Sequence, residues 1–155
     1  MEKTVGIIKS LCRYPAKGEP AIPEKSLVLE AGRGICGDYH SDGGKRQIAV
    51  ITTTEKTWMQ QQEVKGFCFR KYKENLLLDG FSLADCHAGD RLQIGDAVLE
   101  IADSGKSCHR ELCSLAKTGG SCMLAGRSMF AFVCTGGTIE TGMRVIIHDG
   151  RPGTR

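Results

Sequence analysis

One cysteine of this chain lies in a segment rich in cationic side chains. Lys106 precedes Cys108, and His109 and Arg110 follow it directly. Cations this close favour the thiolate, which is the form of cysteine that attacks as a nucleophile or binds a metal. A helix beginning near Cys108 would add the partial positive charge of its N-terminus. The pattern indicates a reactive or metal-binding thiolate, with a buried structural thiol as the alternative.

Two further cysteines, Cys113 and Cys122, follow closely. Together with Cys108 and His109 they supply the ligand types of a zinc site, but adjacent side chains diverge and the spacings match no common zinc knuckle. A redox pair is another interpretation, in which one of Cys108 and Cys113 attacks and the other resolves. The other cysteines have apolar neighbours and are predicted to be small core residues: Cys12, Cys36, Cys68, Cys86 and Cys134.

A glycine-rich segment carries a second group of polar side chains. Asp38 and His40 sit in a loop that suits hydrogen bonding to a ligand or holding a proton. A loop aspartate also commonly forms a turn by bonding its own backbone. Further along, Arg46 follows two glycines that allow close backbone approach, and its planar guanidinium suits a bidentate phosphate contact. The alternative for Arg46 is a solvated strand edge.

A third polar segment contains Glu74 and Asn75, followed by Leu76. The Asn75 side chain has donor and acceptor atoms, which suits recognition of a heterocycle. Such residues also commonly lock loops in place, and we favour that interpretation for Glu74.

The elements that must position these residues are mostly short strands. Apolar runs predict strands over residues 5–11, 26–30, 47–52, 129–133 and 143–147. Alternating runs on both sides of Gly95 and Asp96 predict a hairpin over residues 91–101. Thr52 and Glu55 have the spacing of a capping box and predict a helix over residues 54–63, with Trp58 and Met59 on its apolar face. A second short helix is predicted over residues 108–117, and the overall pattern favours a barrel or sandwich.

The composition of the chain indicates which broad class of protein it belongs to. The chain has 155 residues, 41% of them hydrophobic, and a net charge of only +3. We therefore expect one core and no nucleic-acid or membrane partner, either of which would need a concentrated basic or apolar face. No targeting segment is visible, so we expect a cytoplasmic protein whose eight cysteines are mostly reduced.

The ordered set of motifs resembles the MOSC family, named after the C-terminal domain of molybdenum cofactor sulfurases. The set consists of the Gly-Asp loop at Gly37, the arginine before a buried strand at Arg46, the Glu-Asn-Leu segment at Glu74, the Ile-Gly-Asp hairpin at Ile94, and then Cys108. The resemblance covers about residues 30–147 of a single domain over residues 1–155, with residues 149–155 as a flexible tail. It implies a mainly β, barrel-type fold, similar to the pyruvate kinase barrel, with a few short helices.

The resemblance also implies a cofactor and a set of site residues. Cys108 matches the cysteine that ligates molybdenum, or carries sulfur, in the family. The implied cofactor is molybdopterin-type, with its phosphate held by Arg46. Other residues are expected to line its pocket: Asp38, His40, Asn75, Lys106 and His109.

Three departures from the family limit what is carried over. Ser107 stands where many members have proline. The pyridoxal phosphate domain of the long sulfurases is not seen, so we do not expect this chain alone to bind pyridoxal phosphate or to mobilise sulfur from cysteine. The extra N-terminal domain of the molybdenum reductases is not seen either.

Three functions follow as hypotheses. The first is molybdenum cofactor binding through Cys108, with reduction of small N-oxygenated compounds and a redox partner protein. The second is a persulfide carrier that receives sulfur on Cys108 from a donor protein, with Cys113 as the resolving thiol. The third is a non-catalytic barrel that binds a partner protein and holds structural zinc at Cys113 and Cys122.

Overall fold

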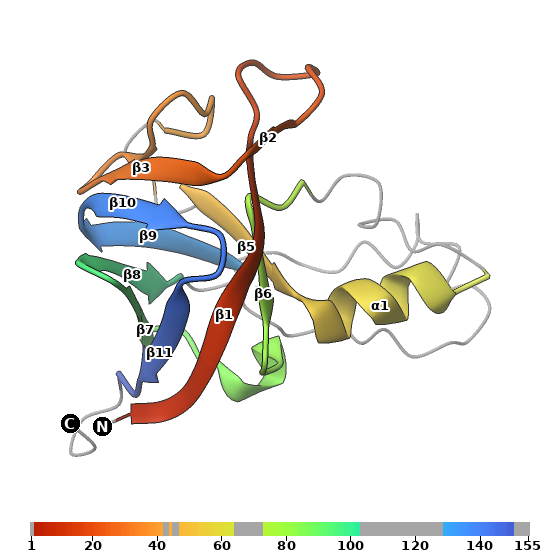
Figure 1. Ribbon diagram of the computed structural model, residues 1–155, viewed down its shortest axis with the longest axis vertical. Coiled ribbons are helices and arrows are strands. Elements are labelled where there is room, and N and C mark those ends of the chain that lie inside the picture. Colours follow the sequence, from red (N-terminus) through yellow and green to blue (C-terminus); the bar gives the residue numbers. More distant parts are fainter. Residues whose placement is uncertain (1, 42–43, 45–46, 64–72, 103–128, 151–155) are drawn as a thin grey trace.

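A closed β-barrel forms the centre of the computed structural model, which describes residues 2–41, 44, 47–63, 73–102 and 129–150 (Figure 1). Seven strands close the ring in the order β1, β11, β7, β8, β9, β5, β6 and back to β1. Their bounds are β1 Glu2–Arg13, β5 Ile48–Thr52, β6 Leu76–Asp79, β7 Arg91–Ile94, β8 Ala97–Ile101, β9 Phe130–Thr135 and β11 Arg144–His148. All neighbours in the ring are antiparallel except β5 and β6, which are parallel. The predicted fold class, mainly β with a barrel, is confirmed.

Four further strands lie outside the ring. β2 (Ile22–Glu24) pairs with the last residues of β1. β10 (Gly137–Glu140), β3 (Ser26–Glu30) and β4 (Gly34–Ile35) form a separate sheet in that order. Figure 1 shows β3 and β10 side by side next to β9, and the backbone N–H of Gly32 bonds the carbonyl of Val133 at this junction. This small sheet holds the start of the glycine-rich loop against the barrel.

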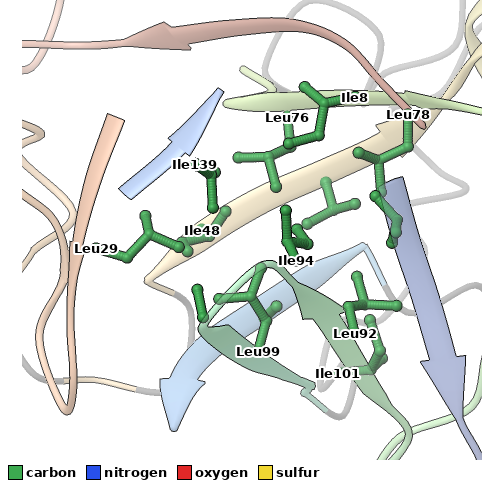
Figure 2. Packing of buried hydrophobic residues seen from close by; sticks show 14 of the residues in the cluster. Ile8, Leu29, Ile48, Leu76, Leu78, Leu92, Ile94, Leu99, Ile101 and Ile139 are labelled. Atoms are coloured by element: carbon green, nitrogen blue, oxygen red, sulfur yellow. The ribbon is translucent and has the colours of Figure 1, made fainter. Parts of the chain in front are cut away.

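Apolar side chains on alternate strand positions fill the barrel, as the two-residue period of a strand requires. β7 shows the pattern clearly, because Leu92 and Ile94 are buried while Arg91 and Gln93 are exposed. Figure 2 shows side chains from several strands meeting in one cluster; its labelled members are Ile8, Leu29, Ile48, Leu76, Leu78, Leu92, Ile94, Leu99, Ile101 and Ile139. The interior of the ring is therefore filled by a packed hydrophobic core.

The predicted strands and hairpin are confirmed, with ends that differ by a few residues. β7 and β8 pair across Gly95 and Asp96, and Gly95 takes the left-handed φ of +60° that this tight turn needs. β2, β4, β6 and β10 were not predicted, because runs of four residues or fewer carry too little pattern. The helix predicted over residues 108–117 lies outside the described residues.

The helix after β5 is confirmed as α1 (Thr53–Gln61), but its start is built differently from a capping box. The Thr52 hydroxyl donates to the Glu55 carboxylate, and the Thr52 side chain makes no capping hydrogen bond to the backbone of the first turn. Glu55 is fully buried and also accepts from Ser82 Oγ at 2.6 Å and from the Leu83 backbone N–H at 3.2 Å. It thereby ties α1 to the short 3-10 helix η1 (Leu83–Asp85). Among the described residues, no helix is long and apolar enough to cross a membrane.

The prediction that the scattered cysteines are core residues is right for Cys86 and wrong for Cys36. Cys86 is buried in the barrel cluster, whereas Cys36 is exposed, because the chain leaves the small sheet just before it. Cys12 and Cys134 are half-buried, and Cys68 lies outside the described residues.

At the C-terminal end, the barrel holds the chain beyond β11. Asp149 is buried, and the Gly150 backbone N–H donates to Asp90 Oδ1 at 2.9 Å. The packed chain therefore extends two residues past His148.

Candidate functional site

The structure describes three of the predicted site residues, namely Asp38, His40 and Asn75. The others lie outside the described residues: Arg46, Lys106, Cys108, His109 and Cys113, together with Cys122. Within the described part of the chain, no three His, Cys, Asp or Glu side chains come together as a metal site. The three described site residues, Asp38, His40 and Asn75, form what we call the polar frame of the site.

The frame lies where three neighbouring strands share one end. The parallel strands β5 and β6 both begin here, and β1, antiparallel to β6, ends here. Asn75 directly precedes β6 and extends both pairings by one residue. Its backbone N–H donates to the Ala49 carbonyl at 2.8 Å, and its carbonyl accepts from the Cys12 N–H at 2.9 Å.

The Asn75 side chain completes this junction. Its Oδ1 accepts from the Ala49 N–H at 3.0 Å, and its Nδ2 donates to the Cys12 carbonyl at 3.2 Å and to Asp38 Oδ2 at 2.8 Å. With 1% of its surface exposed, Asn75 is almost closed to solvent. Its donors and acceptor hold protein groups together, which gives it a structural role in the frame.

The Asp38 carboxylate connects the polar residues at this end of the barrel through four hydrogen bonds. Oδ2 accepts from the Tyr14 backbone N–H at 2.9 Å in addition to Asn75, and Oδ1 accepts from the backbone N–H of His40 at 2.9 Å and from its Nδ1 at 3.0 Å. The carboxylate is 0% exposed. Burial alone would raise the pKa of Asp38, but the hydrogen bonds outweigh it and hold the pKa below its ordinary value. Asp38 is therefore a buried, ionised carboxylate.

The turn-forming role that the sequence suggested for Asp38 is confirmed, whereas its hydrogen bond to a ligand stays a prediction. The bond to the His40 backbone N–H two residues on is the turn-forming contact. The bonds to Tyr14 and Asn75 span 24 and 37 residues and join the loop to two strands. The network of Asp38, His40, Tyr14 and Asn75 is called the Asp38 network below.

His40 is the member of the Asp38 network that reaches solvent. Its side chain is 31% exposed, and its ring stacks on Tyr39 with centroids 3.9 Å apart and an angle of 34° between the planes. A ring held by a carboxylate on one edge and an aromatic face on the other is well placed to meet a ligand in a fixed orientation.

A second cluster lies beside the first, around Glu74. Cys12 Sγ and the Tyr14 hydroxyl both donate to the Glu74 carbonyl, at 3.0 and 3.2 Å. The Glu74 carboxylate pairs with Lys56 of α1, which agrees with its predicted role in locking a loop. Burial raises the pKa of the Cys12 thiol, and burial together with the neighbouring Cys12 raises the pKa of Tyr14. Both groups are therefore neutral supports.

Sequence reasoning missed Gln47, the buried residue that follows Arg46. Its Nε2 donates to the Gly44 carbonyl at 2.7 Å and its Oε1 accepts from the Val133 N–H at 2.9 Å. Gly34 leaves room for it, since a Cβ there would lie 3.0 Å from Gln47 Cβ. The signal available was a single polar residue directly before the apolar run of residues 48–51. Tyr14, also missed, had no signal, because its role comes from a backbone N–H.

The fold and the frame define a barrel protein in which a Gly-Asp loop is bonded to a Glu-Asn-Leu segment. The family model described as the MOSC domain matches residues 37–145, and this chain belongs to the MOSC family. A search of curated proteins finds no match to this chain.

Solved structures agree with this assignment at the level of the fold. The chain is similar to the YuaD protein from Bacillus subtilis, with a TM-score of 0.69 and 17% identity over 97% of this chain and 100% of that one. It is also similar to YiiM from Geobacillus stearothermophilus, with a TM-score of 0.56 and 16% identity over 97% of this chain and 76% of that one. YiiM from Escherichia coli gives a TM-score of 0.53 and 15% identity over 96% and 70%.

Proposed function

We propose that this protein binds the molybdenum cofactor, with the Cys108 thiolate as the ligand of the metal. A soft thiolate suits a high-valent molybdenum centre. Membership of the MOSC family supports the proposal. The observation that carries it furthest is the 2.8 Å bond between Asp38 and Asn75, because it brings two separate motifs of the family pattern to one end of the barrel.

The described residues fit a pterin-type ligand in their chemistry. His40 and Tyr39 are half-buried and offer a fixed ring edge and an aromatic face, which suit a flat heterocycle with polar edges. The phosphate of the cofactor needs a cation, and we assign that role to Arg46, with Lys106 and His109 as further contacts. When bound, the cofactor supplies a metal that can exchange two electrons.

We further propose a reaction for this protein and a cellular location. The substrate class is small N-oxygenated molecules: the N–O bond breaks, the substrate takes up two electrons and two protons, and the oxygen leaves as water. A redox partner protein supplies the electrons. We place the protein in the cytoplasm, where thiols such as Cys108 stay reduced.

Pterin content tests the binding site. The protein is purified from cells that make the cofactor, and its pterin is released and quantified by fluorescence. We expect near-stoichiometric pterin in the wild type and a loss of tenfold or more in Arg46→Gln, because a neutral amide cannot replace a bidentate guanidinium. Lys45→Gln removes a neighbouring charge and is the matched control. Absence of pterin from wild-type protein would contradict the proposal.

A further inference from the structure

The partners of Asp38 determine which nitrogen of His40 carries the proton. Three of the four groups that bond the carboxylate can only donate: the Tyr14 N–H, the His40 N–H and the Asn75 amide Nδ2. The fourth is His40 Nδ1, 3.0 Å from Oδ1. An ionised carboxylate is an acceptor only, so Nδ1 must be the protonated nitrogen.

It follows that neutral His40 is held as the Nδ1–H tautomer. Its lone pair is then on Nε2, at the edge of the ring away from the carboxylate. The loop backbone holds this orientation from the other side, because the Tyr39 N–H donates to the Tyr14 carbonyl at 2.9 Å while the Tyr39 ring stacks on His40. A buried aspartate that fixes the tautomer of a histidine is the arrangement that serine-protease triads use to prepare a base.

We propose that Asp38 is a positioning residue for His40, and that His40 Nε2 accepts a hydrogen bond or a proton from a ligand bound at this end of the barrel. The ligand is one that presents an N–H or O–H donor. The part that concerns the ligand rests on the proposed function, and two sources fit it: a ring N–H of the pterin, or the O–H of an N-hydroxylated substrate. The tautomer itself does not depend on any cofactor.

Asp38→Asn has a defined consequence. The new amide has one oxygen for the four donors that the carboxylate served. Turning that oxygen to Tyr14 and Asn75 keeps two bonds, whereas the opposite orientation sets an NH₂ against both of their donors. The amide NH₂ then takes the place of Oδ1, so that the His40 backbone N–H loses its acceptor. The His40 ring can accept from this NH₂ only by moving its proton to Nε2, and the bond so formed offsets part of the loss. We therefore expect Asp38→Asn to fold and to invert the tautomer.

Nitrogen-15 NMR of the imidazole rings, at a pH where they are neutral, tests this on protein without cofactor. The chain has four histidines, and the signal absent from His40→Asn identifies His40. We expect the Nδ1–H tautomer in the wild type, the Nε2–H tautomer in Asp38→Asn, and no change in Asp96→Asn, which alters an exposed hairpin aspartate. An Nε2–H tautomer in the wild type would overturn the assignment without any variant, and an unchanged tautomer in a folded Asp38→Asn would overturn the role of Asp38.

His40→Asn tests the ligand. Its amide nitrogen can take the place of Nδ1 and keep the bond to Asp38, while Nε2 is removed. A tenfold or greater loss of pterin in His40→Asn assigns the donor to the cofactor. Unchanged pterin content with a tenfold or greater loss of kcat for reduction of an N-hydroxylated substrate assigns the donor to the substrate. If neither changes, His40 does not contact a ligand; if wild-type protein itself lacks pterin, the proposed function fails while the tautomer result stands.

Discussion

Replacing Asp38 with alanine should destabilise the fold far more than a typical loop substitution. The change leaves the buried Tyr14 N–H without an acceptor, removes one of two acceptors from Asn75 Nδ2, and frees the half-buried His40 N–H. An unsatisfied buried donor costs about 1–3 kcal/mol, so we expect a loss of about 3–4 kcal/mol in the free energy of unfolding. For a chain of 155 residues this lowers Tm by roughly 6–16 °C.

Urea unfolding followed by circular dichroism measures this loss, with the slope m compared between variants to confirm that the same surface unfolds. Glu19→Ala, in an exposed turn, is the control and should stay within about 0.5 kcal/mol of the wild type. A loss below about 1 kcal/mol in Asp38→Ala would mean that the Asp38 network does not hold the loop to the strands.

Three further outcomes follow from the structure. Because the pKa of Asp38 is lower in the folded state, its ionised carboxylate stabilises the fold above the unfolded-state pKa of about 3.9. The difference in free energy of unfolding between wild type and Asp38→Asn should therefore be constant near neutral pH and shrink as pH falls through the lower folded-state pKa. A difference that stays unchanged in acid would contradict this. Leu99→Ala, in the centre of the barrel, should cost about 2–5 kcal/mol in urea unfolding, and a cost near zero would mean that the ring is not packed. In native protein, iodoacetamide should label Cys36 readily and Cys86 only after unfolding, as peptide mass spectrometry can show; equal labelling would argue against the burial of Cys86.

Local signals explain which parts of the fold the sequence predicted. The β7–β8 hairpin was predictable, because its alternation and its Gly95–Asp96 turn lie within eleven contiguous residues. The strands β2, β4, β6 and β10 were not, because each is set by its partners: β6, for example, is an apolar run that pairs with β1 and β5 on its two sides. Thr52 and Glu55 marked the helix start correctly, but the pattern did not show that Glu55 would turn inward to Ser82.

The same distinction applies to the candidate site. Residue types pointed to Asp38, His40 and Asn75, since a polar residue in a glycine loop or before a strand is visible in one sequence. The different roles of these three residues were not visible in the sequence, because the roles depend on contacts such as that between Asp38 and the Tyr14 N–H. Burial makes Asp38 and Asn75 supports and leaves His40 at the surface, and no local pattern encodes that difference.

The metal content of the purified protein is the most direct test of molybdenum binding through Cys108. Wild type, Cys108→Ser and the control Cys122→Ser are purified without air from cells that make the cofactor, and molybdenum and zinc are measured per chain. We expect near-stoichiometric molybdenum in wild type and in Cys122→Ser, and its loss in Cys108→Ser, since a serine hydroxyl is a poor ligand in place of a soft thiolate. Molybdenum absent from the wild type, or retained in full by Cys108→Ser, would contradict it.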